Sequence, residues 1–386
     1  MLYLQVLLNG LVLGGLFACI AAGFSLVWGV LNVINILHGS FIVLGAYAAW
    51  YGHALWGIHP FVSILLVAPL FFALGYAIQS GLLNRVIAAP VLLTLTLTFG
   101  LDLMLSNAYQ NWYRFSRNPT AMIGLVIVVL CVTAAILAPY ITPFPDHVGA
   151  VTNFRARHLP PSAVNWFGTD NVGRDIFTRV IFGLRISLLL AVVVLGIAIP
   201  TGTILGMAAG YFGGWTEIII MRITDVALAI PPLVMALAVA AVLSPDLLHS
   251  MLAIASLWWT WHTRMIYSIT RQLRTQEFIE AAETLGASKF HILFREILPN
   301  CVSAIAVKTS LDCGFVILVG AALSFLGLGI QPPTPDLGTM VAQGASFLPD
   351  FWWESVLPGC AILFLALGFN LLGDGLRDLF DVEDVR

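Results

Sequence analysis

The first 84 residues of this chain contain no Lys, Arg, Asp or Glu. Soluble domains carry about 25% charged residues, so a charge-free segment of this length does not suit a surface exposed to water. Long apolar stretches occupy residues 4–30, 38–56, 60–84 and 90–110. Each is near the length of about 20 residues at which a helix crosses about 30 Å of hydrocarbon. The sequence therefore predicts three or four membrane helices in its N-terminal part.

The remainder of the chain has the same apolar character. Across 386 residues, 60% are hydrophobic, 10% are charged and the net charge is −3. This composition excludes an ordinary soluble enzyme, a disordered chain and a nucleic-acid-binding protein. We expect an all-α polytopic membrane protein with six further spans, near residues 118–145, 186–216, 226–245, 247–263, 313–335 and 355–373.

Two long polar segments interrupt these six spans, at residues 146–185 and 271–299. If Arg114 and Arg117 are cytoplasmic, alternation of the spans places 271–299 and the C-terminal tail in the cytoplasm as well. The 146–185 loop then lies outside with five arginines. This goes against the positive-inside rule, but the rule governs long loops less strictly.

The cytoplasmic segment predicts two short helices around a turn. Residues on one face of the first helix recur at i, i+3, i+4 and i+7, namely Phe278, Ala281, Ala282 and Leu285. Gly286 stands where a left-handed residue would end that helix, and Ser288 can cap the second, which Pro299 is expected to limit. An alternative is an amphipathic helix lying on the bilayer. Glu277, Glu280 and Glu283 argue against it, because anionic lipids repel carboxylates.

The same segment resembles the EAA loop of ABC-importer permeases. The matching residues are Glu280, Ala281, Ala282, Gly286, Leu298 and Pro299. The resemblance implies a coupling helix that docks into a cleft of a cytoplasmic ATPase, with Glu280 in a charge pair and Gly286 at the turn. Relatives usually carry Ile where this chain has Glu296, and the adjacent Ile297 is expected to supply the apolar contact.

A second motif resembles the extracytoplasmic segment of the C-type permease subunit of dipeptide, oligopeptide and nickel importers. Its residues are Gly168, Thr169, Asp170, Gly173, Arg174, Asp175 and Arg179. Two hypotheses stay open: these residues hold the loop together, which we favour, or they meet the substrate. Segments 324–340 and 357–382 resemble the same subfamily, although Gly320 stands where many relatives carry an acid. The likeness covers residues 113–386 and implies the six-span, MetI-like core of a type I importer permease.

Residues 8–47 resemble a different family, the start of the branched-chain amino-acid ABC permease. The residues that carry this likeness are Asn9, Gly10, Gly15, Gly29, Asn35, His38, Gly39, Gly45, Ala46 and Tyr47. We therefore predict two domains, a truncated branched-chain permease-like segment at 1–110 and a peptide-type permease at 111–386, joined near residues 108–114.

Charged residues also fall inside predicted spans. Asp225 lies three residues after Arg222, and Lys308 lies four residues before Asp312, so both spacings favour pairs within a helix. A charge at the bilayer centre would cost about 2.5–3.5 kcal/mol, so each should face protein or water. Structural pairing is the favoured interpretation, and a transport path or proton relay is the alternative. The Pro231-Pro232 pair should kink its span.

Several chemistries find no support in the sequence. The five cysteines (Cys19, Cys131, Cys301, Cys313 and Cys360) form no CxxC pair, and neither cysteines nor histidines show metal-ligand spacing. Neither lysine follows a G-x-x-x-x-G stretch, so this chain has no P-loop. We expect no enzyme activity, cofactor, metal or nucleic-acid partner.

The resemblance implies an inner-membrane permease subunit of a peptide importer in a bacterium. Its partners would be a second, unlike permease subunit, two ATPase subunits and an extracytoplasmic solute-binding protein. Nickel or another small solute is an alternative cargo for this permease type. Branched-chain amino-acid transport and an ATP-independent channel or carrier are more distant alternatives, and the latter lacks a use for the EAA loop.

Overall fold

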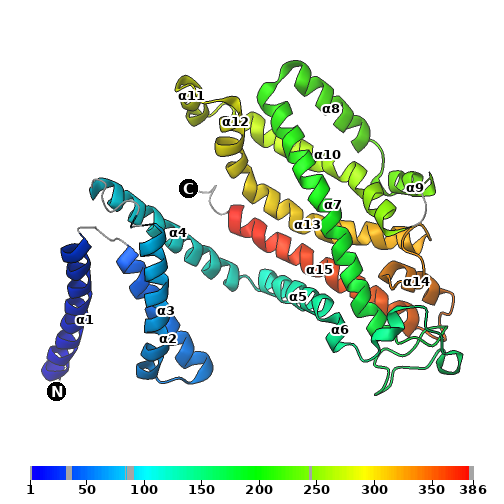
Figure 1. Cartoon of the computed structure of the whole chain (residues 1–386), viewed down its shortest axis with the longest axis horizontal. Helices are drawn as coiled ribbons and strands as arrows, with labels where there is room; N and C mark the ends of the chain where they lie inside the picture. Colours follow the sequence, from blue (N-terminus) through cyan, green and yellow to red (C-terminus); the bar gives the residue numbers. More distant parts are fainter. Residues whose placement is uncertain (1, 32–36, 83, 85–90, 243–245, 382–386) are drawn as a thin grey trace. The chain divides into compact units, whose positions relative to one another are not determined.

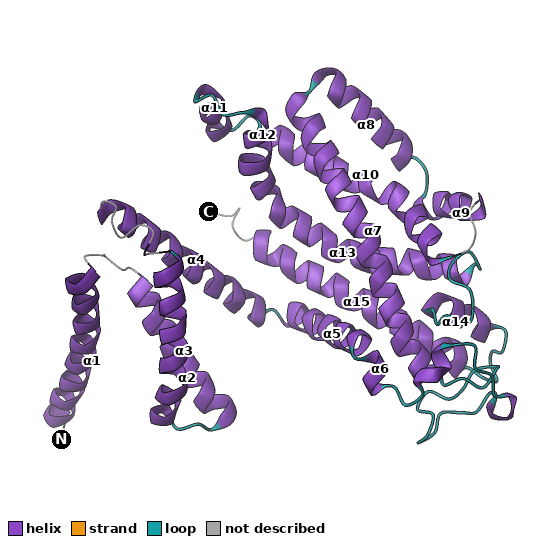
Figure 2. Ribbon diagram, in the orientation of Figure 1, coloured by secondary structure: helices purple, strands orange, loops and turns teal. Residues whose placement is uncertain are grey.

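The computed structural model describes residues 2–31, 37–82, 84, 91–242 and 246–381. Within these residues the secondary structure is helical, with loops and no β-strand (Figure 2). The chain divides into two compact units, Met1–Arg114 and Phe115–Arg386, which are described separately (Figure 1). The all-α architecture predicted from the sequence is confirmed.

The first unit contains four helices at the four predicted apolar stretches. They are α1 (Leu2–Leu31), α2 (Leu37–Trp56), α3 (Pro60–Gly81) and α4 (Val91–Arg117), the last of which runs beyond residue 110 into the second unit. Asn35, one of the residues that carry the N-terminal resemblance, lies outside the described residues.

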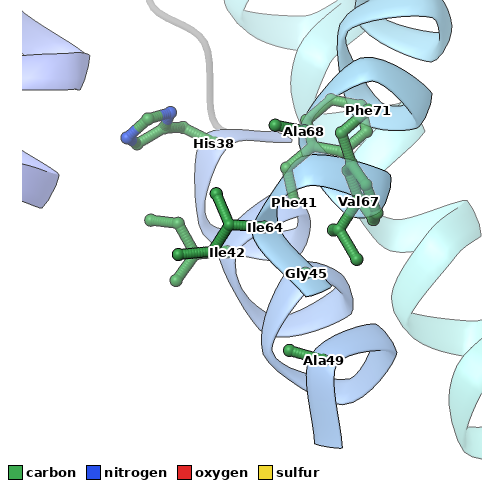
Figure 3. Close-up of a pocket in the computed structure, with 9 residues that line it drawn as sticks. All are labelled: His38, Phe41, Ile42, Gly45, Ala49, Ile64, Val67, Ala68 and Phe71. Carbon is green, nitrogen blue, oxygen red and sulfur yellow. The ribbon is translucent and has the colours of Figure 1, made fainter. Parts of the chain in front are cut away.

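A few polar contacts join the helices of the first unit. His38 Nε2 lies 3.3 Å from the carbonyl oxygen of Ile20, and Ser40 Oγ donates to Asp102 Oδ1 at 2.5 Å. A groove of about 320 Å³ runs between α2 and α3, and Figure 3 shows the His38 ring turned away from the α3 side chains. The other residues that line this groove are apolar or glycine, so it offers no set of polar groups for a substrate.

The second unit is a helical bundle with loops at one end. Its long helices are α5 (Pro119–Ile136), α7 (Ile176–Phe212), α8 (Gly214–Leu228), α9 (Pro232–Val242), α10 (Leu247–Leu273), α13 (Leu298–Phe325) and α15 (Trp353–Asp381). Shorter elements are α6 (Ala138–Ile141), η2 (Pro145–Val148), η3 (Phe154–Ala156), α11 (Glu277–Thr284), α12 (Lys289–His291), η4 (Ile292–Ile297) and α14 (Leu337–Ala345). Figure 1 shows α11 and α12 at one end of this bundle and α14 with the long loop at the other, as the predicted sidedness requires.

Among the described residues, six helices are long and apolar enough to cross a membrane, or seven if the bent pair α8–α9 forms one span. Four of the six (α5, α7, α13 and α15) and the bent pair belong to the second unit. The remaining predicted span of this unit, at 247–263, corresponds to α10. This helix is long enough to cross a membrane but contains four histidine and arginine residues, namely His249, His262, Arg264 and Arg271. Much of α10 is buried, so protein contacts replace the apolarity that lipid would demand.

Several predicted spans differ from the structure in their ends. The span expected at 313–335 is α13, which begins at Leu298 and ends at Phe325. The helix expected at 186–216 begins at Ile176, because the Asp175 side chain accepts a hydrogen bond from Thr178 N at 2.8 Å and caps the helix there. The predicted loop 146–185 is therefore ten residues too long. The span expected at 226–245 is bent by 88° between α8 and α9, at the Pro231-Pro232 pair that was predicted to kink it.

Close helix contact in the second unit depends on glycines. The most extensive helix pair is α7 with α10, where Gly202, Gly206 and Gly210 of α7 meet the α10 backbone and side chains. A Cβ added at Gly206 would lie 2.7 Å from the carbonyl oxygen of Thr263. Small residues at such a seam allow the two backbones to approach, which favours helix packing inside a membrane.

Candidate functional site

The hairpin (residues 271–299) contains the turn expected from the sequence. Helix α11 ends just before Gly286, whose φ is +81°, the left-handed region where glycine is favoured. The N–H of Ala287 donates to the carbonyl of Ala282 at 3.0 Å, which closes the end of the helix. Ser288 Oγ accepts from His291 N at 3.2 Å and caps the second helix, also as expected.

The expectation that Pro299 limits the second helix is wrong. Helix α12 continues through one π-helical segment, Ile292–Ile297, directly into α13, and Pro299 lies in the first turn of α13. The Leu298 N–H donates to the carbonyl oxygen of Leu293, so the helical hydrogen bonds continue up to the residue before Pro299. The hairpin is therefore joined to the bundle by an unbroken helical path. Ile297 is fully buried there, while the nearby Glu296 faces His291 at 3.7 Å.

The buried face of α11 differs from the predicted apolar face. Ile279 is only 1% exposed and packs into a cluster with Met207, Ile266 and Ile292. Phe278 and Ala281 are exposed, and Leu285 is 87% exposed. Of the predicted apolar stripe, Ala282 packs against the same cluster as Ile279, while Phe278, Ala281 and Leu285 face outward. Most of the apolar stripe is therefore exposed on the outer side of the hairpin.

The three glutamates of α11 have different environments. Glu283 Oε1 accepts a hydrogen bond from Tyr211 Oη, near the end of α7, at 2.8 Å. Glu277 and Glu280 lie exposed on the outer side, beside the open stripe. The spacing of the three glutamates in the sequence does not distinguish them. It gave no signal for the contact of Glu283 with Tyr211, because these residues are 72 positions apart.

The 168–179 motif lies at the other end of the bundle and is held mainly by its own hydrogen bonds. Asp170 Oδ1 accepts from the N–H groups of Val172 and Arg174, at 3.0 and 2.8 Å, and Asp170 Oδ2 accepts from Arg174 Nε at 2.7 Å. Thr169 is buried, and its hydroxyl oxygen accepts from Leu159 N at 2.9 Å. These contacts fold the segment back on itself.

Two glycines of the motif occupy positions that only glycine fits. Gly168 and Gly173 have φ of +76° and +83°. A Cβ at Gly168 would lie 2.8 Å from Trp353, and one at Gly173 would lie 2.0 Å from the carbonyl oxygen of Asn153. The motif therefore packs against both the preceding loop and the start of α15.

Asp175 and Arg179 fasten the start of α7 to its surroundings. Asp175 Oδ1 accepts from Asn165 Nδ2 at 2.8 Å while its other oxygen caps the helix. Arg179 is buried, and its Nη1 donates to the carbonyl oxygens of His147 and Pro333 at 3.2 and 3.1 Å. Buried charges that are satisfied in this way indicate a structural network.

The structure adds a side-chain hydrogen bond that the sequence did not indicate. His158 Nδ1 lies 2.6 Å from Glu354 Oε1 at the start of α15, and the His158 ring stacks on Phe351 with centroids 4.1 Å apart. His158 has a left-handed φ of +54°, which no local pattern predicts. The pair joins the loop before the motif to α15.

The charges inside the helices form pairs, one as predicted and one differently. Lys308 Nζ lies 2.5 Å from Asp312 Oδ1, the i,i+4 pair expected on α13. His262 on α10 joins them, with its Nε2 at 3.6 Å from Asp312 Oδ2, and neither His262 nor Asp312 is more than 2% exposed. The partner of Asp225 is Arg264 on α10, at 3.3 Å, instead of Arg222. Helix α8 packs against α10, an arrangement that sequence spacing cannot reveal.

Metal and thiol chemistry have no assembled site in the part of the chain that the structure describes. No group of three or more His, Cys, Asp or Glu side chains there could hold a metal ion, and the five cysteines are free. Two regions thus remain as candidate sites: the outer face of the hairpin and the motif at the opposite end of the bundle.

Comparison with known families gives two matches, one of which begins shortly before the second unit. Residues 202–382 match the family described as binding-protein-dependent transport system inner membrane component. Residues 106–161 match the N-terminal TM domain of oligopeptide transport permease C. The hairpin lies within the first match, and residues 1–105 lie outside both.

Individual relatives match about 70% of this chain. The chain is 43% identical over 275 residues to a probable D,D-dipeptide transport system permease protein of Escherichia coli, covering 71% of this chain and 91% of the relative. It is 41% identical to a dipeptide transport system permease protein of Alkalihalophilus pseudofirmus, covering 70% of this chain and 88% of that protein. A glutathione transport system permease protein of Pectobacterium atrosepticum is 38% identical, with 70% and 90% covered. The chain therefore belongs to the binding-protein-dependent inner-membrane transport permeases and, among them, to the C-type permease subunits of peptide ABC importers.

Proposed function

We propose that this multi-pass inner-membrane permease pairs with a second, unlike permease subunit to form a path for peptides. Two cytoplasmic ATPase subunits would drive the importer, and an extracytoplasmic solute-binding protein would deliver the cargo. Relatives named for D,D-dipeptides, dipeptides and glutathione support a short peptide as that cargo.

The outer face of the hairpin is the observation that carries this proposal. It presents Phe278, Ala281 and Leu285 to solvent beside Glu277 and Glu280. An exposed apolar stripe with charges at its edge is typical of a protein-docking surface. We assign Glu280, Ala281 and Ala282 to the docking helix, Gly286 to its turn, and Leu298 and Pro299 to the junction with α13. Movement of the docked ATPases would reach the bundle here and switch access by rigid-body rocking.

The 168–179 motif has a supporting role in this proposal. Its charged members bond mainly to neighbouring backbone and to one another, so Gly168, Thr169, Asp170, Gly173, Arg174, Asp175 and Arg179 shape the loop instead of holding cargo. Likewise, Lys308 and Asp312 pair with each other and Asp225 with Arg264, which favours structural pairing over a proton relay.

Charge reversal at Glu280 and bulk at Gly286 test the proposal. We expect Glu280→Lys and Gly286→Val to lower uptake of a labelled dipeptide at least about tenfold, because one loses a charge pair across the docking surface and the other strains the turn. The permease should still insert in normal amounts by immunoblot. Asp350→Lys, an equal charge reversal at an exposed position in the loop between α14 and α15, is the matched control and should leave uptake unchanged.

Failure of the proposal has a clear signature. Normal uptake by either hairpin variant at normal expression would contradict the docking role. Purification of the wild-type chain in mild detergent without any ATPase subunit would instead favour an ATP-independent carrier.

The first unit is assigned separately. We propose that residues 1–110 are a branched-chain amino-acid permease-like segment joined to the peptide permease at 111–386. Mass spectrometry of a peptide spanning residues 110–117 from the native host tests the junction. Its detection supports a single translated chain, and two separate proteins would contradict it.

A further inference from the structure

The last two residues of α7 are held by both arms of the hairpin. Tyr211, which is buried, donates from its Oη to Glu283 Oε1 at 2.8 Å. The Arg274 guanidinium, just after α10, lies 5.9 Å from the centroid of the same ring. Lys289, in the second arm, places Nζ 5.6 Å from the ring centroid of Phe212. Cations over aromatic faces at these distances are attractive.

An apolar cluster lies beneath these polar contacts. Ile279, Ile292 and Ile297 of the hairpin pack with Met207 and Tyr211 of α7. Protein interiors are packed as closely as organic crystals, so a packed cluster transmits displacement instead of absorbing it. Movement of α11 is thereby tied to the end of α7.

The opposite end of α7 is equally fixed. Asp175 caps it, and Arg179 bonds to carbonyl oxygens from two separate segments, His147 and Pro333. Between these anchors α7 has 37 residues, or about 55 Å of helix at about 1.5 Å per residue. That exceeds the hydrocarbon thickness of about 30 Å, so one helix reaches from the hairpin to the 168–179 motif.

We propose that α7 carries the coupling between the ATPase side and the opposite loops, and that Tyr211 and Glu283 are the positioning residues that attach it to the hairpin. This inference rests on the proposed docking role of the hairpin. It assigns different duties to two neighbouring glutamates. Glu280 faces the ATPase subunit, whereas Glu283 is hydrogen-bonded to Tyr211 of α7 and transmits the movement of α11 to that helix.

The test uses the complete importer, with both permeases and the ATPase subunits, in proteoliposomes. ATP hydrolysis is measured without and with peptide-loaded binding protein, together with peptide transported per ATP. Tyr211→Phe removes the hydroxyl donor while keeping the ring, so both cation contacts and the cluster are retained. We expect the stimulation by binding protein to fall at least about fivefold, the lower end of usual allosteric coupling, with basal hydrolysis unchanged.

Glu283 variants give the second arm of the test. Glu283→Ala should match Tyr211→Phe, and Glu283→Gln should retain much of the stimulation because its side-chain oxygen still accepts the hydrogen bond. The double variant Tyr211→Phe/Glu283→Ala should be no worse than either single variant, because one shared contact is lost only once. Tyr140→Phe, at an exposed tyrosine of α6, is the matched control and should behave as wild type.

Two results would overturn the inference. One is unchanged stimulation in Tyr211→Phe, and the other is a double variant in which the two losses multiply. Co-purification of the ATPase subunits is scored in every sample. If the wild-type complex retains none, the proposed function itself fails, and this is distinct from loss of coupling within an intact complex.

Discussion

The two units of the chain are both helical and apolar, yet they bury their residues very differently. In the first unit, no described side chain between Leu8 and Val27 is buried, and 6% of the segment Phe61–Gly81 is buried. In the second, half of the Ile176–Phe212 window is buried. Apolar composition alone therefore yields helices suited to lipid, while a packed bundle also requires helices that fit closely against one another.

The surroundings of the glycines show how the two units differ in helix fit. Among the described residues, Gly10, Gly14 and Gly15 of α1 have no atom of another element within 4 Å of the position a Cβ would take. Gly202, Gly206 and Gly210 of α7 all have backbone or side-chain atoms within 3 Å of that position. Lipid and side chains are equally apolar, so helices associate in a membrane through close fit, and the glycines of the second unit provide it.

The largest expected effect is a substitution that breaks this fit. Gly206→Val would place its Cβ 2.7 Å from the Thr263 carbonyl oxygen and separate α7 from α10. We expect a loss of about 3 kcal/mol or more of stability, at the upper end for overpacking, and loss of the monodisperse peak in fluorescence size-exclusion chromatography. Gly14→Val is the matched control in the first unit and should leave that peak unchanged. Equal tolerance of both changes would remove the distinction between the units.

The next effect comes from buried charge. Asp312→Asn leaves Lys308 unpaired beside the buried His262, and breaking a buried pair costs about 3–5 kcal/mol. Asp102→Asn in the first unit keeps an acceptor for Ser40 and should cost less than about 1 kcal/mol. Thermal unfolding in detergent compares the two variants.

A paired replacement sharpens this second prediction. Lys308→Met/Asp312→Leu removes both charges and should recover most of the stability lost in Asp312→Asn. A double variant as unstable as the single one would show that the charges do more than balance each other.

The smallest effect is a pH dependence from the loop before α14. Burial raises the pKa of Asp336 above its ordinary value of 3.8, although hydrogen bonds from Thr339 and Ser324 oppose the shift. The folded state therefore holds this proton more tightly, so the contribution to stability is present below pH 3.8 and is lost as pH rises through the raised pKa. Asp336→Asn should retain the cap of α14 and remove this dependence, with a change in Tm on the order of 2 °C. Identical pH profiles for wild type and variant would contradict the assignment.

Local features of the candidate site could be predicted from the sequence because they depend on near neighbours. The left-handed turn at Gly286, the Ser288 cap and the Lys308–Asp312 pair each involve residues within four positions. Backbone sterics and helical spacing decide such features. The predicted end of the second hairpin helix was wrong because Pro299 lies within a continuous helical path, where a π-helical segment joins α13.

Contacts between distant residues could not be predicted in the same way. Ile279, which lies outside the predicted stripe, is the buried residue of α11, because the cluster beneath this helix includes residues of α7, α10 and α13. The Tyr211–Glu283 bond, the His158–Glu354 pair and the Asp225–Arg264 pair all join separate elements.

The sequence by itself determined that this chain is helical, spans a membrane and carries the EAA pattern of an ABC permease, because hydropathy and short-range spacing need no partner in space. Only the tertiary structure decided which glutamate of α11 is bonded to α7 and which charges neutralise one another. Those outcomes depend on how helices far apart in sequence pack, and packing is set by the fit of whole surfaces, which no single segment contains.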